Sequence, residues 1–327
     1  MASAFERGLF ASSWPRSYAE LRAAGVSPSA LRGPRWRRSS RGFFVPAGLP
    51  ASGPTQRILD VAPLIPGTGA LAGWAAAYVL GVDLLDGIDP FTMSPFPVPI
   101  RLGQDLGRAS GAQVRYVRGD LPDEHRQSIH RLSVTSAMRT AYDGARWATD
   151  VVEAVVFLDQ VAHAIGIDLD ELRRWCDPGS NHPGVQQARQ ALEFADARSA
   201  SPWESRLRMF YVREAHLPRP EVNVPIFDLD GDLLGIGDLL DPEAGMVTEF
   251  DGQDHRLRRR HQADNLREEK LEEANLVVCR VDSLDLRTPR PLVERLQARH
   301  AQGLRRDRGQ DRWTLDQPLW WRRRRAS

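Results

Sequence analysis

Cysteine is scarce in this sequence, with only Cys176 and Cys279 among 327 residues. Neither thiol has a cysteine or histidine partner at zinc-ligand spacing, which argues against a disulfide framework and against a zinc finger. Long apolar runs are lacking too: no stretch approaches the length of a membrane span, and no apolar signal segment is present. We therefore expect a cytoplasmic protein without a membrane partner.

A glycine-rich phosphate loop and a nucleophile elbow are also missing. Lysine is nearly absent, since Lys270 is the only one, and arginine carries almost all of the positive charge. The formal net charge is only +1, but the charge is unevenly distributed. The first 45 residues have a local balance of +6, and the stretch from Gly303 onward has a balance of +5. Both terminal stretches are therefore basic.

The stretch Gly235 to His255 has acidic residues at positions that hydrophobic patterning does not require. Two short apolar runs, 239–240 and 246–247, flank a segment that contains Pro242 and Gly245. Proline and glycine are turn residues with fixed backbone demands, so this pattern predicts a β-hairpin.

The predicted hairpin brings two carboxylates together. A four-residue loop pairs Asp241 with Met246, and counting outward places Asp238 across from Glu249, with Cβ atoms roughly 5 Å apart. Two like charges on one face destabilise a sheet, so we expect a compensating cation, and Mg²⁺ takes oxygen ligands from one or two carboxylates. The alternative is an exposed acidic hairpin whose carboxylates point to water.

The flanking segments have a regular order. Ser201 and Pro202 predict the start of a helix that has Glu204 in its first turn. Strands are expected over 222–227, 233–240 and 276–281, and a charged helix over 256–274. The predicted order is helix, three antiparallel strands, helix, strand.

This region, about 201–286, resembles the PD-(D/E)XK nuclease superfamily, and in particular the nuclease-like domains related to very short patch repair endonuclease. The family's helix-borne Glu resembles Glu204, and its first catalytic Asp resembles Asp238. Its Glu-x-Asp-Gly segment and following His resemble Glu249-Phe250-Asp251-Gly252 and His255. The Asp and Arg of its next helix resemble Asp264 and Arg267.

One position departs from the wider superfamily, because Asp251 stands where the catalytic Lys is expected two residues after the Glu. The repair-endonuclease branch does not have Lys there either. The resemblance therefore favours that branch and leaves the group that activates water open.

The resemblance implies a role for each matched residue. Asp238, Glu249 and the backbone carbonyl of Phe250 would hold Mg²⁺ or Mn²⁺, and Glu204 would orient the attacking water or assist a second ion. Asp251 and His255 would act as second-metal ligand, acid or base. Flanking phosphates would be bound by Arg258, Arg259, Arg260 and Arg267; the alternative for the first three is a solvated helix face.

Residues 17–41 are typical of a small DNA-binding unit. Ser17 predicts a helix that Gly25 ends, and Ser27-Pro28 predict a second short helix, followed by a basic strand pair. This winged-helix pattern resembles the amino-terminal domain of AbiEi-family antitoxins, whose Gly-aromatic-Val wing is matched by Gly42-Phe43-Phe44-Val45. The expected DNA contacts are Arg32, Arg35, Arg37, Arg38 and Arg41. The alternative is a basic helical cap that packs on the rest of the chain.

The predicted fold class is α/β (α+β): a restriction-endonuclease-like αβββαβ core preceded by a small winged-helix domain and a mixed α/β middle domain. The expected parts are a winged-helix domain over 1–50, a middle domain over 55–176 that resembles the AbiEi-type antitoxin body, a linker helix over 177–200, the nuclease-like domain over 201–303 and a basic tail over 304–327. In the tail, Trp320 and Trp321 precede four arginines, a pattern of single-strand binders; alternatively, the two rings fold back on an apolar groove.

The first functional hypothesis is a metal-dependent DNA endonuclease in DNA repair or phage defence, with an amino-terminal DNA-binding domain. The second is a DNA-binding regulator or antitoxin of a type IV toxin-antitoxin system, with a cognate toxin as partner and a nuclease-like domain without the chemistry. The intact set of Glu204, Asp238 and Glu249 favours the first, and the missing Lys favours the second. The oligomeric state stays open.

Overall fold

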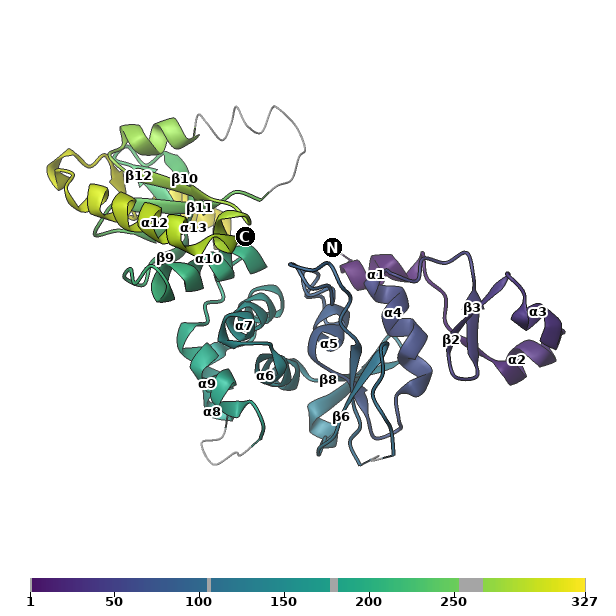
Figure 1. Cartoon of the computed structure of the whole chain (residues 1–327). Coiled ribbons are helices and arrows are strands. Elements are labelled where there is room, and N and C mark those ends of the chain that lie inside the picture. The colour runs from purple at the N-terminus through teal and green to yellow at the C-terminus, as the bar shows by residue number, and fades with distance from the viewer. Residues whose placement is uncertain (1, 105–106, 177–181, 253–266, 327) are drawn as a thin grey trace. The chain divides into compact units, whose positions relative to one another are not determined.

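The computed structural model describes residues 2–104, 107–176, 182–252 and 267–326 (Figure 1). The chain divides into two compact units, residues 1–195 and 196–327. Both units mix helices with strands, in agreement with the predicted mixed α/β class, and the described strands form three sheets. No helix in these ranges is long and apolar enough to cross a membrane.

The first part of unit one has a short helix, a helix pair and a three-stranded sheet. Its elements are α1 (Ala4–Leu9), β1 (Arg16–Ser17), α2 (Tyr18–Ala23), α3 (Pro28–Arg32), β2 (Trp36–Ser40) and β3 (Phe43–Pro46). The strands are antiparallel in the order β1-β3-β2.

The two helices of the pair begin where the sequence predicts. The Ser17 hydroxyl accepts a hydrogen bond from the Glu20 backbone N–H at 3.2 Å, and the Glu20 carboxylate accepts one from the Ser17 N–H at 2.7 Å, which together form a capping box. Ser27 caps α3 by accepting from the Ala30 N–H at 3.1 Å. Gly25 takes a φ of +84°, a left-handed conformation that ends the first helix.

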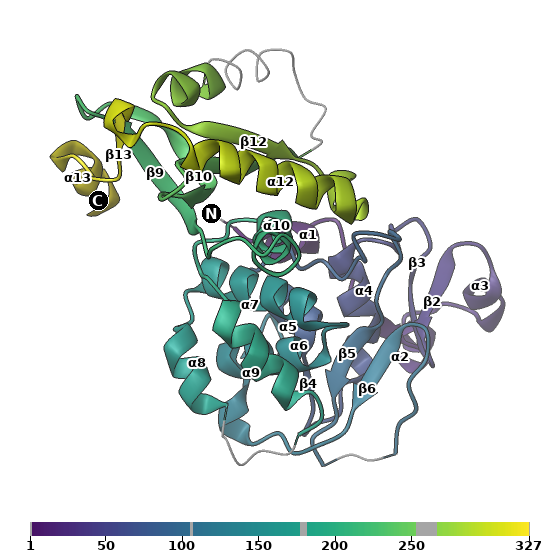
Figure 2. The same cartoon turned by 60° about the vertical axis from the view of Figure 1, so that its left-hand side comes forward.

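The second part of unit one forms a five-stranded sheet in the order β6-β5-β4-β8-β7, with a group of helices beside it (Figure 2). Its elements are α4 (Pro54–Val61), the 3₁₀ turn η1 (Ala62–Leu64), β4 (Ala70–Leu71), α5 (Gly73–Val79), β5 (Val98–Arg101), β6 (Val114–Val117), η2 (Asp123–His125), β7 (Arg126–Ile129), β8 (Leu132–Thr135), α6 (Ala137–Trp147), α7 (Val151–Ile165), α8 (Leu169–Trp175) and α9 (Val185–Phe194).

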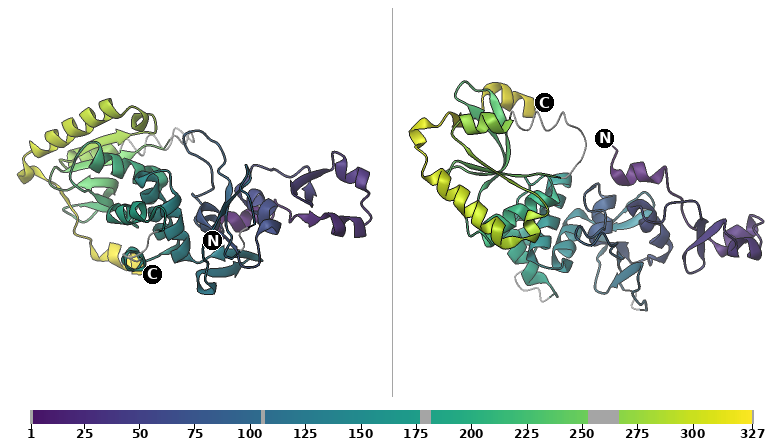
Figure 3. Two further views of the ribbon diagram at one scale, coloured as in Figure 1. Left: turned by 60° about the horizontal axis from the view of Figure 1, so that its bottom comes forward. Right: turned by 45° about the horizontal axis from the view of Figure 1, so that its top comes forward.

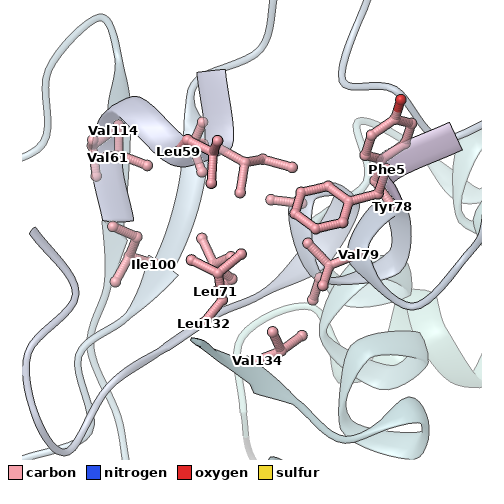
Figure 4. Packing of buried hydrophobic residues seen from close by; sticks show 14 residues of the cluster. Phe5, Leu59, Val61, Leu71, Tyr78, Val79, Ile100, Val114, Leu132 and Val134 are labelled. Carbon is pink, nitrogen blue, oxygen red and sulfur yellow. The ribbon is translucent and has the colours of Figure 1, made fainter. Parts of the chain in front are cut away.

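The core of this part includes residues from distant segments (Figure 4). Phe5 of α1 is fully buried and meets Tyr78 of α5 edge-on, with ring centroids 6.2 Å apart. Leu59 of α4 and Val134 of β8 belong to the same cluster. Helix α1 therefore completes the core of the second part rather than that of the helix pair that follows it in sequence.

Unit two forms a second five-stranded sheet, in the order β12-β11-β10-β9-β13. Its elements are α10 (Pro202–Arg213), β9 (Glu221–Asp228), β10 (Leu233–Asp241), β11 (Met246–Phe250), a helical segment over 267–273, β12 (Val277–Val281), η3 (Asp285–Arg287), α12 (Pro289–Leu304), η4 (Arg308–Gln310), β13 (Trp313–Thr314) and α13 (Leu319–Ala326).

The hairpin register in unit two is confirmed where the strands are bridged. Asp241 pairs with Met246 and Leu239 pairs with Thr248, as the predicted four-residue loop requires. The next strand, β12, runs parallel to β11, and a parallel pair needs a crossover between its strands. Part of that crossover is the helical segment 267–273.

The sheet of unit two is covered on both faces, and Figure 3 shows its strands between the covering helices. On one face, Leu207 of α10 and Leu292 of α12 pack against Leu239 and Met246. On the other face, Leu271 packs against Leu240 and Val247. Side chains along β10 alternate between these two layers, so Asp238 has the same parity as Leu240 and lies on the Leu271 side.

Candidate active site

The Asp238 side chain lies where the β10–β11 ladder ends. It is one residue beyond the last bridged pair, Leu239 with Thr248. Its Oδ2 accepts a hydrogen bond from the Phe250 backbone N–H at 2.7 Å. This hydrogen bond joins the carboxylate of β10 to the end of β11 and holds it in one orientation.

The surroundings of Asp238 hold its carboxyl group near the point of half-protonation at neutral pH. Burial is the largest cause, and together with the nearby Glu204 and Glu249 carboxylates it raises the pKa of Asp238 to about 7. The Phe250 N–H and the Arg267 guanidinium act in the opposite direction. A carboxyl group with this pKa can exchange a proton near pH 7.

Glu249 is partly neutralised by an arginine from the next helix. Arg267 Nη2 lies 2.7 Å from Glu249 Oε1, and the same guanidinium donates to the Ile236 carbonyl. Gly235 makes room for it, because a Cβ at that position would lie 2.4 Å from Arg267 Nε. The resemblance to the nuclease superfamily predicted a role for Arg267, whereas the sequence analysis predicted none for Gly235.

Glu204 is anchored at the start of α10. Its backbone N–H donates to the Ser201 hydroxyl at 3.2 Å, as expected of the predicted cap. Its Oε2 accepts from the Ala200 N–H at 2.9 Å and from Asn223 Nδ2 at 2.6 Å. The carboxylate is therefore oriented by two donors as well as by its helix.

Asn223 is a residue of this region that the sequence analysis missed. It has a φ of +47° within β9, in the left-handed region that Asn tolerates better than most residues. Its amide also donates to the Arg198 carbonyl at 2.8 Å, which links the strand to the segment before α10. The signal available in the sequence was a single polar residue, Asn223, within the otherwise apolar run 222–227.

An aromatic stack adjoins the carboxylates. The rings of Trp203 and Phe250 are parallel within 3°, with centroids 5.4 Å apart. The Arg206 guanidinium lies 4.8 Å from the centroid of the Trp203 ring. Trp203 precedes Glu204, and the Phe250 N–H bonds Asp238, so the stack fixes the backbone on both sides of the site.

Asp251 follows directly after β11 and is exposed. Its backbone N–H donates to the Val281 carbonyl at 2.8 Å, so the backbone at this position is fixed while the side chain faces solvent. The remaining predicted residues of this motif, His255, Arg258, Arg259, Arg260 and Asp264, lie outside the described ranges.

Asp238, Glu249 and Phe250 offer few potential metal ligands. Within the ranges that the structure describes, no three His, Cys, Asp or Glu side chains are grouped to hold a metal ion. Two carboxylates and a backbone carbonyl are nevertheless oxygen donors of the kind that Mg²⁺ uses together with water and phosphate. The negative charges of Glu204 and Glu249 contribute to the raised pKa of Asp238. A bound cation would offset this repulsion.

The arginines predicted to bind DNA fall into two groups. Arg32, Arg35, Arg38 and Arg41 are exposed. Arg37 is partly buried, and its Nη1 lies 2.6 Å from Asp60 Oδ2 of α4. Arg37 therefore ties β2 to the core of the second part, and four of the five predicted side chains face solvent.

The tryptophans of the carboxyl-terminal stretch lie against the sheet of unit two. The rings of Trp320 and Trp321 meet the Phe227 ring edge-on, with centroids 6.1 and 5.6 Å away, and Trp320 Nε1 donates to the Gly231 carbonyl at 3.1 Å. This agrees with the alternative in which the rings fold back on the domain.

Comparison of the chain with protein-family models, with curated proteins and with solved structures gives no match. A function must therefore be inferred from the chemistry of the described residues.

Proposed function

We propose that the chain is a metal-dependent endodeoxyribonuclease, with Asp238, Glu249 and Glu204 at the site of cleavage and the helix pair of unit one as a DNA-binding part. The observation that carries the proposal is the position of Asp238. Its carboxylate is held at the end of the hairpin ladder by the Phe250 N–H, and the charges of Glu204 and Glu249 act on it. A partly buried carboxylate whose pKa is raised by burial and by two other carboxylates is a costly arrangement that is often found at functional sites.

The order of elements in unit two supports assignment to the PD-(D/E)XK superfamily. The chain passes through α10, three antiparallel strands, the helical segment 267–273 and β12, which is the αβββαβ order of that core. Similarly, a capped helix pair followed by a two-stranded wing in unit one supports a winged-helix assignment.

Each residue then has a distinct task. Asp238, Glu249 and the Phe250 carbonyl would hold Mg²⁺ or Mn²⁺; when bound, the ion supplies a positive charge at the scissile phosphate and a more acidic water. Glu204, held by Asn223, would orient the attacking water. Arg267 balances the charge of Glu249 and offers a guanidinium next to the negative phosphate.

Cleavage of supercoiled plasmid and of single-stranded DNA tests the proposal. Wild-type protein should cut with Mg²⁺ or Mn²⁺ and not with EDTA, whereas Asp238→Ala should be folded and inactive, because it lacks one metal ligand without leaving a large core cavity. Asp230→Ala is the matched control, since Asp230 is an exposed carboxylate at the β9–β10 turn of the same sheet. Undiminished cutting by Asp238→Ala would refute the role of Asp238.

The part played by unit one can be tested by salt dependence. Arginine contacts with phosphate make the affinity for DNA fall with salt, with a slope of log K against log salt of about −0.9 for each phosphate neutralised on duplex DNA. Substitution of Arg32, Arg35, Arg38 and Arg41 by Gln should flatten this slope. Arg37→Gln serves as the contrast, because its guanidinium already pairs with Asp60. An unchanged slope in the fourfold variant would mean that this surface does not contact DNA.

A second candidate function is that of a DNA-binding regulator or antitoxin, with a toxin as partner and no cleavage. Two observations favour it: Asp251 stands in the position of the superfamily's Lys, and Arg267 is bound to Glu249, where a metal would compete with it. Metal binding separates the two candidates. Specific duplex binding without measurable Mn²⁺ affinity or cleavage would support the regulator.

A further inference from the structure

A groove in the helix pair and wing has the chemistry of a nucleobase site. It has a volume of about 420 Å³ and is lined by three aromatic residues, Tyr18, Trp36 and Phe44, together with Leu31, Arg32, Arg38 and Gly42. All of these residues come from the short segment 18–44. A volume of this size lies within the range of sites that take small organic groups.

The three rings are mounted on fixed backbone. Tyr18 is the first residue of α2, behind the Ser17 capping box, and its N–H donates to the Gly42 carbonyl at 2.8 Å. Trp36 and Phe44 lie on paired strands, in register with Pro46 and Arg38 respectively. Because the backbone that carries these rings is already fixed, less conformational freedom is lost when a flat group binds.

The lining combines apolar surface with positive charge. Leu31 is buried, whereas Tyr18 keeps 45% of its surface exposed and the guanidiniums of Arg32 and Arg38 are exposed at the same groove. None of the residues that line the groove is acidic. Aromatic faces beside cations suit a flat ring that is linked to an anion, which is the chemistry of a nucleotide.

A base within duplex DNA is stacked between its neighbours and cannot present its face to these rings, so the groove is suited to an unstacked base. We propose that the groove binds a base of single-stranded DNA, stacked on Tyr18 and Trp36, with Arg32 and Arg38 on the adjoining phosphates. This deepens the proposed DNA-binding role of unit one and does not depend on cleavage by unit two.

Fluorescence anisotropy of a labelled thymidine oligomer and of a duplex of equal length, with the full chain in EDTA, tests the proposal. Tyr18→Ala should weaken binding of the single strand about 5- to 150-fold, the range that corresponds to loss of stacking with one base, while duplex binding changes little. Tyr18→Phe keeps the ring and should keep the affinity. Phe10→Ala is the control, since Phe10 is 94% exposed and is not part of the groove.

Unchanged single-strand affinity in Tyr18→Ala, or equal loss for single strand and duplex, would overturn the proposal. Photocrosslinking of wild-type protein to a thymidine oligomer that contains 5-iodouracil provides a test without substitution. Crosslinks should map to Tyr18, Trp36 or Phe44, and crosslinks found only elsewhere would overturn it. Cleavage by the same Tyr18→Ala protein, compared with Asp238→Ala, shows separately whether the nuclease proposal stands.

Discussion

Two aspartates, one in each unit, have opposite surroundings. Asp143 of α6 is fully buried, and its carboxylate meets three guanidiniums at 2.9 to 3.1 Å; these belong to Arg101, Arg139 and Arg146. Asp238 of β10 is only partly buried, and its electrostatic neighbours are the two carboxylates of Glu204 and Glu249, with Arg267 as the opposing charge.

The difference separates a carboxylate neutralised by arginines from one beside other carboxylates. The arginines around Asp143 also bond backbone carbonyls: Arg101 donates to that of Asp120 at 3.1 Å, and Arg146 to that of Pro183 at 2.9 Å. The centre therefore ties loops together around a fixed anion. Asp238 has a pKa near neutrality and a partly open position, so its charge can change with pH or with a ligand.

The three arginines around Asp143 also change the pKa of one of their own number, Arg101. Burial is the main cause that lowers the pKa of Arg101 to about 10, and the charges of Arg139 and Arg146 add to this effect. At Asp238 the neighbouring like charges are negative, and the pKa of its carboxyl group is raised. In both cases burial is the largest cause, and neighbours of like charge act in the same direction.

The largest expected effect is on stability at Asp143. Asp143→Asn leaves three buried guanidiniums without their carboxylate, and we expect the free energy of unfolding to fall by about 3–5 kcal/mol, since removal of one partner strands a buried charge. Asp123→Asn is the control, because Asp123 pairs with Arg126 while its side chain is 88% exposed, and a change of about 0.5 kcal/mol or less is expected. Urea unfolding followed by tryptophan fluorescence measures both. Equal effects would remove the contrast between buried and exposed pairs.

The pH dependence of stability should distinguish Asp238 from ordinary carboxylates. Its folded-state pKa is raised from 3.8 to about 7, so its contribution to stability is fully present below pH 4 and is lost as the pH rises through 7. Asp238→Asn does not carry this charge. The variant should therefore gain stability relative to wild type between pH 5 and pH 8, on the order of 2 kcal/mol.

Unfolding of both proteins at the two pH values gives this difference. A constant difference between wild type and Asp238→Asn would show that the carboxyl group titrates normally.

Part of the fold and of the candidate site was predictable because it depends on local sequence. The hairpin register followed from Pro242 and Gly245, and the helix starts followed from Ser17, Ser27 and Ser201. Such signals act over a few residues, so a single sequence is enough to show them.

Other features could not be predicted because they depend on tertiary contacts. Arg101 reaches Asp143 across 42 residues of sequence, and Asn223 reaches Glu204 across 19. Val134 pairs with Leu71 in the sheet, and only two residues later Ser136 caps α6. A short apolar run before a cap can be strand or helix, and here the sheet partner decided.

A smaller effect is expected at Gly235, which gives Arg267 its place. Gly235→Ala would put a Cβ 2.4 Å from Arg267 Nε, so the guanidinium must move away from Glu249. Because Arg267 lowers the pKa of Asp238, that pKa should rise further, and stability should fall by about 1 kcal/mol. Gly48→Ala is the control, since nothing lies within 4 Å of its added Cβ. Titration followed by NMR of the Asp238 carboxyl carbon measures the shift, and an unchanged pKa would contradict the role given to Arg267.

The smallest effect is expected at the exposed Asp251. If its charge assists the metal, Asp251→Asn should weaken Mn²⁺ binding about two- to fivefold, the size of a solvent-screened interaction. Asp251→Lys should then reduce cutting, whereas a position that only replaces the superfamily's Lys would keep or improve it. Calorimetric Mn²⁺ titration and plasmid cleavage decide between the two, and equal Mn²⁺ affinity in Asp251→Asn would contradict a metal-binding role.

Calorimetric titration of Mn²⁺ into wild type, Asp238→Asn and Asp230→Asn, at pH 6 and pH 8, tests most directly whether Asp238 and Glu249 hold a metal ion. Wild type and Asp230→Asn should bind Mn²⁺, more tightly at pH 8 because Asp238 must lose its proton to act as a ligand. Asp238→Asn should bind at least about tenfold more weakly at pH 8 and show little dependence on pH. Mn²⁺ affinity in Asp238→Asn equal to that of wild type would contradict the account.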